Sequence, residues 1–296
     1  MEWWHAVILG IVEGITEYLP VSSTGHLILA SAALGLDDPD SIKQAVDTFS
    51  IVIQGGAILA IVGLYWPRLI QMLQGLVGRN DDGRRLLINI CIAFLPAALT
   101  WPILYPLTKG ILFRPGPVLA ALLLGGLWMI WIDRWRKRRY PDAYPDDDTP
   151  APGIELDQIT PKLALGVGLF QWASLWPGTS RAMMTIGGGM MLGLRPKAAA
   201  EFSFLLGLPT IGAACVYEGY GAWKDSRSED TESFIAVLGI TPILIGFIVS
   251  AVVAAIVVKW FVGFLERRGL AFFGYYRILL ALIMGSLLFM GVIALN

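Results

Sequence analysis

Charged residues, cysteines and histidines are all scarce in this chain of 296 residues. Charged residues make up 15% of the sequence and the formal net charge is -1, which leaves no general basic surface for nucleic acid. The two cysteines, Cys91 and Cys215, stand alone in apolar segments, so they indicate neither a disulfide framework nor a thiolate metal site, and we expect them to fill the core. The first apolar stretch follows no basic leader and is not predicted to be a removable signal peptide.

Apolar residues dominate the composition of the chain. They make up 56% of the chain, with 11 tryptophans and a mean hydropathy of +0.65, which is typical of an all-α polytopic membrane protein. Six segments are long and apolar enough to predict transmembrane helices: 50–66, 86–107, 117–132, 197–216, 234–258 and 273–295.

Two further apolar segments, 3–36 and 161–194, are each interrupted midway by polar sequence. The interruptions fall at Pro20 and at Pro177, and both are followed by hydroxyl-bearing residues that are unsuited to contact with lipid. Each segment therefore predicts a re-entrant pair, in which a helix enters the membrane, turns inside the protein and returns.

The two broken segments resemble each other and indicate an internal repeat. Pro20, with SSTG after it, matches Pro177, with GTSR after it, at an offset of 157, and TFSIVIQGGA matches EFSFLLGLPT at an offset of 153. Each half then holds a re-entrant pair and three spans, and because three is odd the second half must be inverted. We predict repeats over 1–132 and 161–296, a cytoplasmic linker over 133–160, and tips that meet near the bilayer midplane.

The distribution of basic residues predicts the orientation. In this layout 16 of the 22 lysines and arginines, Arg277 among them, fall in inner segments, 5 fall in outer ones, and Arg181 lies at the second tip. The positive-inside rule places both termini outside, so the first broken segment enters from the outer face. The stretch 140–152, rich in proline and aspartate, is predicted to be a solvated inner linker.

The first break carries a pair of acids in the run EGITEYLPVSSTGH. Glu13 and Glu17 lie one helical turn apart on the same face, where two buried carboxylates repel each other. They require a partner, which is either a basic side chain or a hard divalent cation, Mg²⁺ or Ca²⁺, completed by phosphate oxygens.

The same run continues into the start of a helix. Ser22, Ser23, Thr24 and Gly25 offer free backbone N–H groups and hydroxyls, which suit either helix capping or the binding of an anion. Ser23 and His26 lie one turn apart, so Ser23 is a candidate nucleophile, and His26 is a candidate nucleophile or general acid.

The second break, PGTSRAMMT, offers a fixed positive charge. Arg181 follows Gly178, Thr179 and Ser180 at another free helix start, and we predict that its guanidinium clamps phosphate. Three polar residues inside apolar runs are instead predicted to brace the two halves: Gln54, Gln171 and Glu201.

The sequence resembles the undecaprenyl-diphosphate phosphatase family of the bacitracin-resistance type. The resemblance lies in the runs EGITEYLPVSSTGH and PGTSRAMMT, together with FQ at 170–171 and EFSFLL at 201–206. The resemblance implies hydrolysis of undecaprenyl diphosphate to the monophosphate and inorganic phosphate, in the bacterial inner membrane and with a site open to the outer side. It carries the active-site serine and histidine to Ser23 and His26, and favours Ser23 as nucleophile. The family usually has serine where this chain has Ala182, and Thr185 is the candidate replacement.

Two other interpretations stay open at this stage. A secondary transporter or lipid flippase uses the same inverted repeats and broken helices. A phosphatase of the phosphatidic-acid type needs a second histidine, and His5 is the only other one here. The expected partners are the lipid substrate and membrane lipids, with monomer and homodimer both compatible with the sequence.

Overall fold

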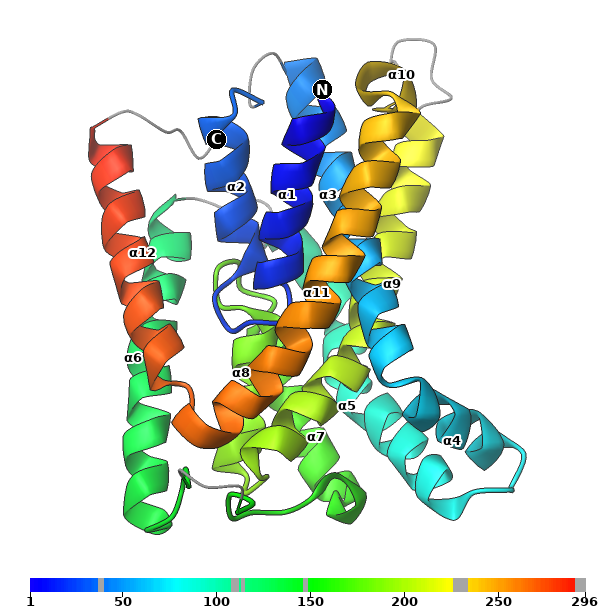
Figure 1. Ribbon diagram of the computed structural model, residues 1–296, viewed down its shortest axis with the longest axis vertical. Coiled ribbons are helices and arrows are strands. Elements are labelled where there is room, and N and C mark those ends of the chain that lie inside the picture. Colours follow the sequence, from blue (N-terminus) through cyan, green and yellow to red (C-terminus); the bar gives the residue numbers. More distant parts are fainter. Residues whose placement is uncertain (37–39, 108–111, 113–114, 146–148, 226–233, 291–296) are drawn as a thin grey trace. The chain divides into compact units, whose positions relative to one another are not determined.

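The computed structural model describes residues 1–36, 40–107, 112, 115–145, 149–225 and 234–290. Within these residues the chain is α-helical, apart from turns, one short 3-10 helix (Leu156–Gln158) and one isolated β-bridge between Ile154 and Leu194. The helices follow one another as drawn in Figure 1: α1 (Trp3–Thr16), α2 (Ser23–Ala33), α3 (Asp40–Leu64), α4 (Trp66–Leu76), α5 (Asp81–Leu107), α6 (Pro115–Arg139), α7 (Pro161–Ala173), α8 (Arg181–Met191), α9 (Pro196–Asp225), α10 (Phe234–Leu238), α11 (Ile240–Arg268) and α12 (Ala271–Phe289). The all-α prediction is confirmed.

The six predicted spans are confirmed as six helices long and apolar enough to cross a membrane. No more than half of the most apolar stretch of each helix is buried inside the protein, so the remaining apolar side chains are available to lipid. Residues 291–295 of the last predicted span lie outside the described residues. The six helices cover Gln44–Leu64, Asp81–Leu104, Gly116–Arg139, Pro196–Gly221, Ile240–Arg268 and Ala271–Phe289.

Two local features were not predicted. The span expected from residue 234 is divided, because Gly239 has a φ of +79° and separates α10 from α11. The amphipathic helix α4 follows the span that was expected to end at Trp66, and it has a proline in its first turn.

The order of elements supports the internal repeat. Helix α1 has 14 residues and α2 has 11, and after the second break α7 has 13 and α8 has 11. Both pairs precede a long apolar helix, α3 and α9 respectively. Helix α2 begins at Ser23 and α8 at Arg181, so the helix starts correspond at an offset of 158 rather than the predicted 157. The inversion of the second half stays a prediction.

The described chain forms two compact units, and the first comprises Met1–Tyr18, Ser23–Leu64 and Gly207–Val258. In this unit α1 and α2 lie side by side (Figure 1). Helix α1 also packs closely on α11, because a methyl group added at Gly10 would lie 2.7 Å from the carbonyl oxygen of Gly246, and one at Gly14 would lie 2.8 Å from that of Ser250. This glycine contact fixes the face of α1 that bears Glu13.

The second unit comprises Leu19–Ser22, Tyr65–Leu206 and Lys259–Asn296. Helices α6 and α12 approach closely in it, since Gly126 and Gly274 each face the other's carbonyl oxygen, which an added methyl group would meet at 2.7 Å. Arg277 lies one turn further along α12 and is fully buried. Arg277 was counted among the basic residues of the inner segments, but an arginine that donates to backbone carbonyls inside the fold does not report orientation.

The linker prediction needs a similar correction. Helix α6 continues to Arg139, past the predicted end at residue 132. The stretch after it is only partly solvated: Asp142 and Thr149 are exposed, whereas Ala143 is buried and the Ala151 N–H donates to the Glu266 carboxylate at 3.0 Å. The three consecutive aspartates of the linker, residues 146–148, lie outside the described residues.

Candidate active site

The first break joins two of the predicted residues directly. Glu17 caps the end of α1, and Ser23 is the first residue of α2. The Ser23 hydroxyl donates to Oε2 of Glu17 at 2.8 Å. A hydroxyl bonded to a carboxylate has a base in place to take its proton, which is the arrangement that activates a serine as a nucleophile.

Glu13 lies one turn before Glu17 and is almost completely buried, with 1% of its surface exposed. With both acids ionised, no donor in the described part of the chain reaches its carboxylate oxygens, and the Glu17 carboxylate is close enough to share a proton with it or to repel its charge. A buried carboxylate in this position requires a proton or a cation. Its oxygens are the donors that Mg²⁺ and Ca²⁺ prefer, so the residues fit the predicted ion.

The described residues hold no cluster of three or more histidine, cysteine or acidic side chains suited to a metal. Two carboxylates alone leave most positions around a hard divalent cation unfilled. Hydroxyl, amide and substrate phosphate oxygens have to complete the coordination.

Gln54 is a residue whose role sequence reasoning missed. Its Nε2 donates to Oε2 of Glu17 at 3.4 Å, the oxygen that also accepts the Ser23 hydroxyl, so Gln54 contacts the candidate site in addition to its predicted bracing role. Its Oε1 accepts from the Cys215 thiol at 3.7 Å. The available signal was an amide alone in an apolar run. The core-filling prediction is wrong for Cys91, which is exposed.

The other predicted residues of the first break surround Ser23 in sequence. Ser22 and Gly25 are buried, Thr24 is exposed and His26 is half-buried in the first turn of α2. His5 lies 12 residues before Glu17, about 18 Å along a helix that rises 1.5 Å per residue. This separation disfavours the interpretation that needs two histidines at one site.

The second break places Arg181 at the first position of α8. Its Nη1 donates to the carbonyl oxygen of Ser203 at 2.9 Å and to the Ser203 hydroxyl at 3.3 Å. The Thr185 hydroxyl lies 2.6 Å from the same hydroxyl and donates to the Arg181 carbonyl at 2.8 Å. Ser203 therefore orients Arg181, a role that the sequence did not reveal because Ser203 is 22 residues away.

The turn before α8 is held by local hydrogen bonds. The Ser180 hydroxyl accepts the Met183 N–H at 3.3 Å and caps the helix, and the Thr179 hydroxyl donates to the Trp176 carbonyl at 2.5 Å. Gly178 has a φ of +89°, which requires glycine. Thr179 and Ser180 thus have structural partners as well as their predicted place in the anion site.

Both tips end in a serine with an unfavourable backbone. Ser22 has a φ of +75° and Ser180 a φ of +72°, and within the described residues they are the only non-glycine positions with positive φ. Such a conformation costs roughly 1–3 kcal/mol and persists where the surroundings impose it, typically at functional sites. The strain occurs directly before Ser23 and directly before Arg181.

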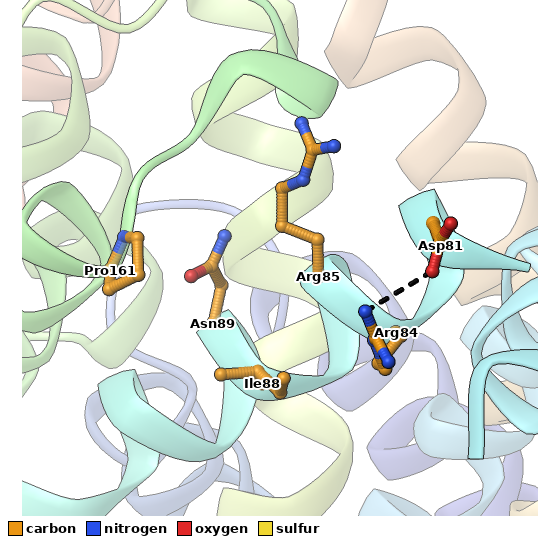
Figure 2. A pocket seen from close by; sticks show the side chains of 6 residues that line it. All are labelled: Asp81, Arg84, Arg85, Ile88, Asn89 and Pro161. Carbon is orange, nitrogen blue, oxygen red and sulfur yellow. Dashed lines mark ion pairs between the residues drawn. The ribbon is translucent and has the colours of Figure 1, made fainter. Parts of the chain in front are cut away.

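Two polar hollows in the second unit do not contain these residues. One, of about 350 Å³, is lined by Arg84, Arg85, Asn89 and their neighbours at the start of α5 (Figure 2). Arg84 and Arg85 pair with Asp81 and Asp82, so their charges are already compensated. The other, of about 420 Å³, includes Glu201.

The fold and the two tips define a class: a multi-pass α-helical membrane protein whose broken helices present carboxylates, hydroxyls and an arginine suited to phosphate chemistry. Within that class the chain belongs to the family described as bacitracin resistance protein BacA, which matches residues 6–283.

Three relatives extend the match over nearly the whole chain. A protein of Sorangium cellulosum is 45% identical over 280 residues, covering 95% of this chain and 84% of its own. One of Desulfovibrio desulfuricans is 41% identical, covering 93% and 94% of the two chains. One of Aquifex aeolicus is 39% identical, covering 96% and 97%. All three are named undecaprenyl-diphosphatase.

Proposed function

We propose that this protein is an undecaprenyl-diphosphatase, which hydrolyses the lipid diphosphate to undecaprenyl phosphate and inorganic phosphate. The observation that carries the proposal is the Ser23 hydroxyl bonded to the Glu17 carboxylate, in a member of a family whose relatives bear that name. Such hydrolysis returns the lipid carrier for cell-wall synthesis and removes the diphosphate lipid that bacitracin sequesters.

The geometry supports a two-step reaction. Ser23 Oγ attacks the terminal phosphorus while Glu17 takes its proton, and the bond from that phosphorus to the bridging oxygen breaks. Undecaprenyl phosphate leaves, with His26 positioned one turn from Ser23 as the candidate donor of a proton to the leaving oxygen. Water then cleaves the phosphoserine and releases inorganic phosphate. Arg181, oriented by Ser203, binds the phosphate oxygens.

The proposal includes a divalent cation, Mg²⁺ or Ca²⁺, held by the carboxylates of Glu13 and Glu17. The support is the buried Glu13 carboxylate, whose oxygens have no hydrogen-bond partner in the described chain. A bound cation supplies positive charge that offsets the negative charge of the diphosphate. The chain's own residues keep the roles given above.

Phosphate release from undecaprenyl diphosphate by detergent-purified protein tests the function. We expect wild-type protein to release phosphate, a chelator to abolish release, and added Mg²⁺ or Ca²⁺ to restore it. Failure to release phosphate in any cation would contradict the phosphatase and favour a transporter or flippase. If a chelator leaves phosphate release unchanged, the phosphatase function is supported and the proposed role of the cation is contradicted.

The same proposal places the protein in the bacterial inner membrane with the first break entering from the outer side. The support is the excess of basic residues in the predicted inner segments, such as Lys137, over the outer ones, such as Lys224. Both side chains are exposed. Single cysteines at positions 137 and 224, in a background without Cys91 and Cys215, should react with an impermeant thiol reagent only from the inside and only from the outside respectively. Labelling of both from one side would refute the orientation.

A further inference from the structure

We propose that Arg277 is a positioning residue that holds the two broken-helix tips together, an inference that rests on the proposed function and extends it to α12. Arg277 is fully buried. No ion pair is recorded for it in the part of the chain that the structure describes, and its guanidinium donates only to backbone carbonyls. The acceptors are those of Gly178 at 2.7 Å, Ala121 at 3.0 Å, Leu122 at 3.4 Å and Pro20 at 3.4 Å.

Two of these carbonyls occupy corresponding places in the two halves. Pro20 lies two residues before Ser22, and Gly178 lies two residues before Ser180. Ser22 and Ser180 are the two strained serines, and each directly precedes a helix start. One guanidinium therefore binds the same point of both tips, and all of these residues belong to the second unit.

The other two carbonyls fix the guanidinium itself. Ala121 and Leu122 belong to α6, which packs against α12 through Gly126 and Gly274. Arginine suits this task because its planar head carries five N–H donors in a fixed arrangement, whereas lysine offers three donors at one point. A buried charge is costly unless it is fully hydrogen-bonded, so the bonds to the tips contribute to keeping Arg277 in place.

The position of the tips bears directly on the chemistry. Ser23 follows the first strained serine and Arg181 follows the second, so a shift of either tip moves the nucleophile or the phosphate clamp. Displacements of about 1 Å in a reacting geometry can lower turnover by about a hundredfold. Arg277 touches no reacting atom, and its effect is through the backbone of the tips.

The test compares Arg277→Met with Arg136→Met. Arg136 is also fully buried and donates to backbone carbonyls, those of Leu194 and Pro152, at the other end of α6. We expect both variants to melt at lower temperature than wild type. Only Arg277→Met should lose turnover, by about a hundredfold in kcat with KM changed far less, and Arg277→Lys should recover part of it. Equal losses of kcat in both variants, or none in Arg277→Met, would overturn the inference.

A second pair of variants covers the case in which Arg277→Met does not fold. A methyl group added at Gly125 would lie 2.7 Å from Nη2 of Arg277, whereas one at Gly116 on the same helix meets nothing within 4 Å. Gly125→Ala should therefore displace the guanidinium and reduce kcat, and Gly116→Ala should not. Unchanged kcat in Gly125→Ala would contradict the positioning role.

Hydrogen exchange separates this inference from the proposed function, since it requires no activity. Segments 19–23 and 177–181 should exchange faster in Arg277→Met than in Arg136→Met. Unchanged exchange in both segments refutes the positioning role even if phosphate is released. If these segments exchange faster but the protein never releases phosphate, the positioning role of Arg277 is supported and the proposed phosphatase function is contradicted.

Discussion

Glu17→Gln is expected to lower kcat for phosphate release by about 10²–10⁴-fold, the contribution usual for a general base. The substitution leaves an amide oxygen that still accepts the Ser23 hydroxyl but cannot take its proton. It also removes one of two neighbouring buried carboxylates, which relieves repulsion with Glu13. In the presence of a chelator the variant should therefore melt at the same temperature as wild type or higher, an outcome typical of a site that sacrifices stability for activity.

Two comparisons make the Glu17→Gln result specific. Asp82→Asn removes an exposed carboxylate from a surface ion pair with Arg85 and should leave turnover unchanged. Glu13→Gln loses a carboxylate that has no hydrogen-bond partner in the described chain, so its defect should be partly reversed by a higher concentration of Mg²⁺ or Ca²⁺. Glu17→Gln should resist that treatment. If kcat of Glu17→Gln lies within tenfold of the wild-type value, Glu17 is not the general base.

The membrane fold could be predicted because its signals are local. Six long apolar segments become six helices, and Pro20 and Pro177 mark both breaks, since a run of apolar residues and a proline act on the chain within a few residues. The errors occur where local and long-range effects compete. Gly239 and the proline in the first turn of α4 mark helix boundaries that a hydropathy pattern does not show.

The sequence predicted the motif residues of the candidate site but not the residues that hold them in position. Glu17 and Ser23 lie six residues apart in one motif, so their contact was foreseeable. Gln54 and Ser203 lie far from the motif residues that they bind, and no pattern in the sequence states that their side chains point to Glu17 and Arg181. Arg277 was counted with the inner basic residues because it lies near the start of a predicted span, and only packing reveals its burial.

The transporter interpretation predicts a different effect of Ser23→Ala. A transporter or flippase needs no nucleophile, so Ser23→Ala should spare movement of lipid diphosphate across vesicles. An enzyme loses its reaction instead. Measuring both activities on the same preparation separates the two classes. Transport that survives Ser23→Ala in a protein without hydrolysis would contradict the phosphatase, whereas hydrolysis retained in Ser23→Ala would contradict Ser23 as the nucleophile.

Ser23→Ala is expected to abolish phosphate release, whereas Ser31→Ala, two turns further along α2, should leave it unchanged. The identity of the phosphorylated residue gives the sharper result. If Ser23 is the nucleophile, wild-type protein quenched during turnover of labelled substrate carries a phosphate that survives acid, and Ser23→Ala carries none. If His26 is the nucleophile, the label is lost in acid and still forms in Ser23→Ala. Because Ser23 Oγ already donates to Glu17 at 2.8 Å, the hydroxyl is the group with a base in place, and the acid-stable product is the expected one.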